Sequence, residues 1–182
     1  MQADYPVLLD ACVLVNQPVV DLLLRLSEEP RLLLPKWSDL ILVEVERTLF
    51  SWKHWQQNQM VAKFINVLRS EFPEALLTSY EDLIPLMENN EKDRHVLAAA
   101  VKGKIELIVT FNVKDFPPKS CEKWGVEAKH PQDYLITMFL LKPNRVIQSL
   151  DAIAKYRKES REDILLRLGK HVPKFSSMIL GV

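Results

Sequence analysis

The sequence is poor in cysteine and glycine and has no long apolar run. Cys12 and Cys121 are its only cysteines, too few for a disulfide framework or a cysteine-based zinc site. Its four glycines form no glycine-rich phosphate loop. No apolar stretch approaches the roughly 20 residues that span a bilayer, and the first residues lack the basic and apolar regions of a secretion signal. We therefore expect a protein of the reducing cytoplasm, with no membrane association.

The charges balance overall but are unevenly distributed. The 182 residues carry 24 Lys and Arg against 24 Asp and Glu. Residues 1–100 hold 9 basic and 15 acidic residues, a net of −6, whereas residues 101–182 hold 15 and 9, a net of +6. This division is compatible with a carboxylate-rich site beside a surface that follows phosphates. Scatter over solvated helix faces explains it equally simply.

Buried strands alternate with helices along the chain. We expect strands at residues 7–9, 31–34, 73–77, 105–109 and 126–128. We expect helices at residues 18–29, 38–71 (as a helical hairpin), 93–102, 131–141, 143–158 and 161–168. The alternation predicts an α/β fold of three α/β/α layers around a mainly parallel sheet. We expect residues 1–141 to form the main domain, with 142–182 as a helical extension packed on it.

Acidic residues stand where a parallel sheet places its sites, at the carboxyl ends of strands. Asp10 follows the first strand, Asp115 lies in the turn after the 105–109 strand, and Asp93 opens the alanine-rich helix. Glu44 or Glu46 supplies a fourth acid, and helical periodicity does not choose between them. Carboxylates without interleaved cysteine or histidine suit Mg²⁺ or Mn²⁺. Taken singly, each aspartate is also explained as a helix cap or turn residue.

Four segments, in order, resemble the PIN-domain family. They are LLDACVLV, WSDLILVEVERTL, DRHVLAAAV and IVTFNVKDFP, and their order and spacing match the family from about Val7 to Leu135. The family is known for metal-dependent endoribonucleases, including the VapC-like toxins of toxin–antitoxin pairs. The resemblance implies a PIN-like fold, a parallel sheet between helices with acids gathered at one edge.

The resemblance also assigns roles to individual residues. It implies catalytic, metal-binding acids at Asp10, Glu44, Asp93 and Asp115, supported by Thr110 and Asn112. It is the resemblance that prefers Glu44 to Glu46. One position departs from the pattern: relatives often carry another acid where this chain has Asn90, which puts an extra metal ligand in doubt.

The activity implied is hydrolysis of RNA phosphodiester bonds by a Mg²⁺- or Mn²⁺-dependent endoribonuclease, either a solitary nuclease or a toxin paired with an antitoxin protein. A homodimer is expected by the same resemblance. Candidates for following the RNA backbone are Lys114, Lys119, Lys123 and Lys129, which serve equally well as solubilising surface. The alternative is a PIN-like module that binds RNA or protein with little or no catalysis, using the 142–182 extension as a partner surface.

Zinc chemistry is not expected, because the four histidines (His54, His95, His130 and His171) lack zinc-ligand spacing. His95, in the first turn of its helix, is expected to be solvated or locally bonded rather than catalytic.

Overall fold

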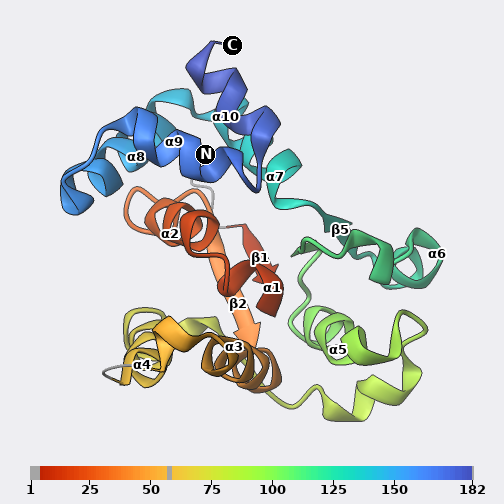
Figure 1. Cartoon of the computed structure of the whole chain (residues 1–182). Helices are drawn as coiled ribbons and strands as arrows, with labels where there is room; N and C mark the ends of the chain where they lie inside the picture. The colour runs from red at the N-terminus through yellow and green to blue at the C-terminus, as the bar shows by residue number, and fades with distance from the viewer. Residues whose placement is uncertain (1–4, 57–58, 182) are drawn as a thin grey trace.

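A computed structural model, which describes residues 5–56 and 59–181, shows a parallel sheet between helices (Figure 1). The strands are β1 (Pro6–Leu9), β2 (Leu34–Ser38), β3 (Leu76–Leu77), β4 (Leu107–Val109) and β5 (Glu127–Lys129). The helices are α1 (Ala11–Leu14), α2 (Gln17–Leu26), α3 (Asp39–Ser51), α4 (Met60–Glu71), α5 (Arg94–Lys102), α6 (Pro118–Cys121), α7 (Pro131–Leu141), α8 (Pro143–Arg157), α9 (Arg161–Gly169) and α10 (Pro173–Leu180). The predicted three-layer α/β/α, PIN-like fold class is confirmed.

The strand order is β3-β2-β1-β4-β5, and every neighbouring pair is parallel. Parallel connections are almost always right-handed, so the direction in which the chain crosses the sheet decides which face a helix covers. The helices between β1 and β3 therefore lie on one face, and α5, which returns the chain to β4, lies across the sheet from them (Figure 1). None of the described helices has both the length and the apolar character needed to cross a membrane.

The central strands are buried on both faces, which explains their unbroken apolar sequence. Val7, Leu8 and Leu9 of β1 have no exposed surface. Helix α5 contributes a run of fully buried small side chains, Ala98 to Ala100, which suits close packing against the sheet. Gly103 follows this helix, and a larger residue would be crowded there, because a Cβ would lie 2.9 Å from Leu77 Cδ2.

Four elements differ from the sequence expectations. The expected strand at 31–34 is wrong: β2 begins at Leu34 and runs through Pro35. The Leu34 N–H donates to Tyr5 O on the β1 side of β2, so the nitrogen of the next residue, Pro35, faces the β3 side. Strand β3 pairs with β2 only from Trp37 onward, so the missing N–H of Pro35 breaks no hydrogen bond. Only residues 76–77 of the expected 73–77 strand are extended, and helix α10 was not expected at all. The expected helix through 53–71 is interrupted, and residues 57–58 within it lie outside the described part of the chain.

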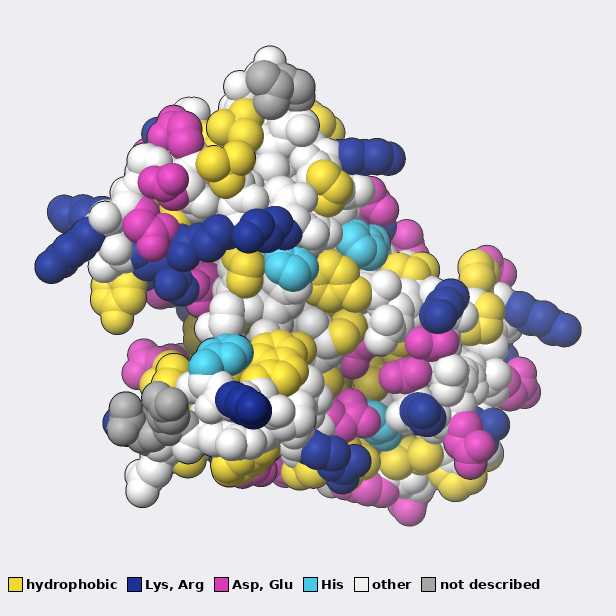
Figure 2. Space-filling view, in the orientation of Figure 1, with side chains coloured by type: hydrophobic (Ala, Val, Ile, Leu, Met, Phe, Trp, Pro, Cys, Tyr) yellow, Lys and Arg dark blue, Asp and Glu magenta, His cyan; other side chains and the backbone are white. Residues whose placement is uncertain are grey.

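Figure 2 shows basic and acidic side chains interspersed over one face of the molecule. Both signs are present in the upper part, where α8 and α9 lie, and in the lower right part, where α5 lies. The opposite net charges of residues 1–100 and 101–182 therefore do not divide this face into a basic and an acidic half.

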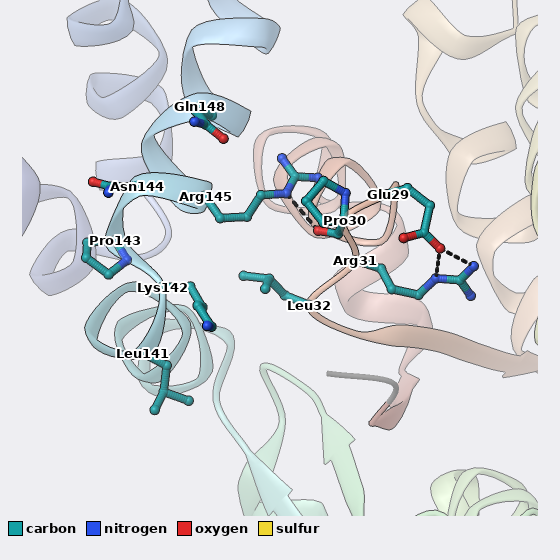
Figure 3. Close-up of a pocket in the computed structure, with 10 residues that line it drawn as sticks. All are labelled: Glu29, Pro30, Arg31, Leu32, Leu141, Lys142, Pro143, Asn144, Arg145 and Gln148. Carbon is teal, nitrogen blue, oxygen red and sulfur yellow. Dashed lines mark hydrogen bonds and ion pairs between the residues drawn. The ribbon is translucent and has the colours of Figure 1, made fainter. Parts of the chain in front are cut away.

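Arg145 makes several of the hydrogen bonds that join the C-terminal helices to the rest of the chain. Arg145 of α8 donates from Nε to Pro30 O at 2.9 Å and from Nη2 to Arg25 O and Glu28 O, both at 2.9 Å. Its Nη1 donates to Ser149 Oγ at 2.7 Å. Figure 3 shows this side chain reaching from α8 toward Pro30, at the side of a hollow of about 430 Å³. These bonds join α8 to the last turn of α2, at Arg25, and to the segment that follows it, at Glu28 and Pro30.

Replacing Arg145 tests whether the 142–182 extension belongs to one folding unit with the rest. We expect Arg145→Ala to lower the free energy of unfolding by about 2–3 kcal/mol, because it leaves three carbonyls without their charged donor. Arg145→Lys should recover only part of this loss, since an ammonium group lacks the guanidinium fork. The measurement is urea unfolding followed by circular dichroism.

The matched control is Gln148→Ala, which changes an exposed residue of α8 that lines the same hollow. We expect a change within about 0.5 kcal/mol. Equal effects of the two alanine substitutions would contradict the role given to Arg145.

Candidate active site

Asp10 is a buried carboxylate held by three donors. It directly follows β1, and its side chain is 3% exposed. Oδ1 accepts from Ala11 N–H at 2.7 Å, and Oδ2 accepts from the Thr110 hydroxyl at 2.6 Å and the Cys12 thiol at 3.2 Å. Burial raises the pKa of Asp10, and these three hydrogen bonds oppose that rise. The Thr110 bond joins the ends of two neighbouring strands, β1 and β4.

An open hollow of about 360 Å³ lies over this strand end. Four of the predicted residues line it: Asp10, Glu44, Asp93 and Asn112. Glu46 does not line it, so position separates the two glutamates that the helical pattern left equivalent. Thr110 is fully buried beneath the hollow and acts through Asp10.

Glu44 is held by a histidine from another helix. His95 Nε2 lies 3.1 Å from Glu44 Oε1, joining α5 to α3 across 51 residues of sequence. His95 was expected to be solvated or locally bonded, and at 8% exposure it is not solvated. A position beside Asp93 in an otherwise apolar helix was the available signal, but the long-range partner was not readable from sequence. The pair fixes the direction in which the Glu44 carboxylate points.

Asp93 receives the repulsion of the other acids. Burial, followed by the negative charges of Asp10, Asp115 and Glu44, raises its pKa to about 6, and His95 opposes this only weakly. Among the four predicted acids of the described chain, Asp93 is the one whose carboxylate makes no side-chain hydrogen bond or ion pair. A carboxylate in this setting is stabilised by a proton or by a cation.

Asp115 lies at the edge of the site rather than in the hollow. It does not line the 360 Å³ hollow, although its charge reaches Asp93. Asn90 Nδ2 donates to Asp115 Oδ1 at 3.0 Å, and Asn90 N–H donates to Asp115 O at 3.1 Å. The amide at position 90 therefore gives Asp115 a hydrogen bond without adding a further negative charge.

The chemistry of the donors fits a hard divalent cation. The acids offer only oxygen ligands, and a double positive charge would relieve the repulsion that raises the pKa of Asp93. In their present rotamers, no group of three His, Cys, Asp or Glu side chains among the described residues is arranged to hold a metal ion. Three of the four acids instead bond to neighbouring side chains. Residues 10, 44, 93 and 115 thus fit such an ion by type, and its presence remains a proposal.

Basic residues flank the hollow unevenly. Arg47, a basic residue three positions after Glu44 that was not among the lysines expected to follow the RNA backbone, lines the hollow one helical turn after Glu44. Lys114 and Lys129 line a neighbouring hollow. Lys123 pairs with Glu88 at 2.8 Å. The expected backbone-following role of the lysines therefore stays a prediction.

Comparison with known proteins finds one partial relative. A protein of Mycobacterium tuberculosis named "Putative ribonuclease VapC50" is 36% identical to this chain over 107 residues. The match covers 57% of this chain and 63% of that protein, so the chain spans less than two thirds of its relative's length. No protein-family model matches the chain, and no solved structure matches it. Over just over half its length, the chain is thus similar to a protein whose name is that of a VapC-like ribonuclease.

The raised pKa of Asp93 predicts how pH changes the stability of the metal-free protein. An unfolded aspartate titrates near pH 4 and the folded Asp93 near pH 6, so the folded state binds an extra proton between these values. The free energy of unfolding should therefore fall as the pH rises through this window. We expect Asp93→Asn to remove this part of the fall, about 1 kcal/mol once solvent screening is allowed for.

The measurement is urea unfolding of both proteins in a chelator at about pH 4.5, 5.5 and 7. The stability of the variant relative to the natural protein should increase with pH. Parallel pH profiles would show that neither burial nor the neighbouring charges raise the pKa of Asp93 in the folded protein.

Proposed function

We propose that this protein is a metal-dependent endoribonuclease that hydrolyses RNA phosphodiester bonds with Mg²⁺ or Mn²⁺. The observation that carries the proposal is the meeting of Asp10, Glu44 and Asp93 in one open hollow at the carboxyl ends of β1 and β4. Similarity to a protein named as a ribonuclease supports the same reaction class. The described residues that line the hollow include no serine, and burial raises the pKa of the Cys12 thiol to about 12, which makes this thiol a poor substitute for a water nucleophile.

The residues divide the proposed reaction among them. Asp10, Asp93 and Asp115 would hold the cation, with Glu44 as a further ligand or as the group that orients the attacking water. The ion would lower the pKa of a bound water and neutralise charge on the phosphate. Thr110 and Cys12 keep Asp10 in place, and His95 keeps Glu44 in place. Arg47, at the rim, is placed to attract the phosphate backbone.

The partners remain part of the proposal. The name of the relative is that of a VapC protein, which supports a toxin restrained by an antitoxin. A homodimer is proposed on the resemblance alone. Exposed apolar side chains on α3 and α4, where a partner would be sought first, are Leu40, Val43, Phe50, Met60 and Val67.

The competing function is a PIN-like module that binds RNA or protein without cleaving it. One observation favours it: three of the four acids already have hydrogen-bond partners, and no ready-made metal group exists among the described residues. In this case Mg²⁺ or Mn²⁺ would add little stability.

Cleavage of a mixed RNA set, with structured and single-stranded members, separates the two functions. We expect cleavage only with Mg²⁺ or Mn²⁺, and we expect Asp93→Asn to reduce its rate about 100-fold or more, because a ligand to the ion is lost. The matched control is Glu91→Gln, which removes an exposed acid two residues away that does not line the hollow. This variant should cleave like the natural protein.

Metal binding is measured in parallel by thermal unfolding. An ion at 100 times its dissociation constant adds about 2.7 kcal/mol of stability. That gain should disappear in Asp93→Asn and persist in Glu91→Gln. Folded protein, free of any inhibitor, that neither cleaves RNA nor gains stability from either ion would establish the binding module instead.

A further inference from the structure

A second hollow, of about 530 Å³, lies beside the acid hollow at the ends of β4 and β5. Phe111 and Val113 line it, whereas Asn112 between them lines the acid hollow. The two hollows therefore share one wall of three consecutive residues. The second hollow therefore adjoins the place where a phosphate bound over the acids would lie.

The shared wall is fixed to the acid site by hydrogen bonds. Asn112 N–H donates to Thr110 Oγ1 at 3.0 Å, and Phe111 N–H donates to Cys12 Sγ at 3.3 Å. Thr110 and Cys12 are the same side chains that donate to Asp10. A ligand held in the second hollow is thereby positioned relative to Asp10.

The opposite wall is fixed to the same strand end. Thr110 N–H donates to Lys129 O at 3.0 Å, which continues the β4–β5 pairing. His130 follows, and its Nδ1 accepts from Gln132 N–H at 3.1 Å at the start of α7. A neutral His130 ring therefore carries its proton on Nε2, where it is a hydrogen-bond donor.

The lining combines an aromatic wall with balanced charge. The Phe111 ring lies 5.1 Å from the His130 ring in an edge-to-face arrangement and is half-buried. Lys114 and Lys129 line the hollow together with the acids Glu127 and Asp133, and Lys129 Nζ lies 3.6 Å from Glu127 Oε1. Two cations and two acids give no net attraction for a phosphate. An uncharged, planar ligand with both donors and acceptors is the better match.

We propose that this second hollow binds a nucleobase of the RNA, that of a nucleotide next to the scissile phosphate, and so sets the base preference of cleavage. The inference rests on the proposed ribonuclease function. Aromatic side chains and hydrogen-bonding groups are the means by which proteins read unpaired RNA bases. Phe111 and His130 supply the rings, and Lys114, Glu127 and Asp133 supply donors and acceptors for the base edge.

The test uses RNA oligonucleotides of one sequence in which single nucleotides around the mapped cleavage site are made abasic. Stacking of one base contributes about 1–3 kcal/mol. We therefore expect one abasic position beside the scissile phosphate to slow cleavage by the natural protein about 10-fold. In His130→Asn, which removes the ring but keeps a side chain suited to a helix N-terminus, the same change should cost about 3-fold or less.

The matched control is His54→Asn, the same substitution at an exposed histidine that lines neither hollow. Its abasic penalty should equal that of the natural protein. An equal penalty in His130→Asn, with an unchanged melting temperature, would overturn the inference, and so would the absence of any sensitive position.

A binding measurement separates failure of this inference from failure of the proposed function. If no RNA is cleaved, fluorescence anisotropy gives the affinity of the same oligonucleotides for the natural protein, His130→Asn and His54→Asn. An abasic penalty lost only in His130→Asn would keep the base site and reject the nuclease. No binding, or a penalty shared by all three proteins, would reject the base site.

Discussion

Electrostatic repulsion among carboxylates at one edge of a parallel sheet is the constraint to which the rest of this site responds. Bringing such groups together in a partly dry hollow costs free energy unless each finds a proton, a donor or a cation. Three of them have donors from distant parts of the chain: Asp10 has Thr110, Glu44 has His95, and Asp115 has Asn90. Asp93 has no such donor, and burial together with repulsion by the neighbouring acids raises its pKa to about 6. The hollow is therefore electrostatically prepared for a positive charge.

The same strand end organises what surrounds the acids. Thr110 donates its hydroxyl to Asp10 and its N–H to Lys129 O, so β1, β4 and β5 end at a common place. The C-terminal extension reaches this edge too, because His171 bonds to Asn16 at 2.9 Å and its ring lies 6.5 Å from Phe111. Sheet, acid hollow and extension thus share contacts. A substitution at His171 in the extension therefore changes contacts with residues at the rim of the site.

The fold was largely predictable because its signals are local. The apolar run before Asp10 and the alanine-rich stretch before Gly103 each indicate a buried element, and the structure has both. The misplaced strand at Pro35 shows the limit: proline is tolerated there because of which side of β2 is unpaired, a property of the neighbours. The predicted strand at residues 73–77 was also wrong in its extent, since a strand of two residues, Leu76–Leu77, carries almost no sequence pattern.

The site was predictable in its residues but not in its contacts. The positions of acids at strand ends, together with the family resemblance, predicted Asp10, Glu44 and Asp93 as site residues. The structure puts all three around one hollow. The pairing of His95 with Glu44 joins residues 51 positions apart, and no periodicity in one chain reports such a contact. Asn90 could be recognised in the sequence as a departure from the family pattern. Its hydrogen bond to Asp115 could not, because that bond depends on how two turns pack together.

The claim at the centre of this account is that the acids at the end of β1 and β4 hold a divalent cation. The most direct measurement is X-ray diffraction from crystals of the full chain soaked in Mn²⁺, with data collected to give the anomalous signal of manganese. The account predicts an anomalous peak bounded by carboxylate oxygens of Asp10 and Asp93, absent from crystals of Asp93→Asn. A manganese-saturated crystal with no peak there, or with peaks only at surface carboxylates elsewhere, would contradict it.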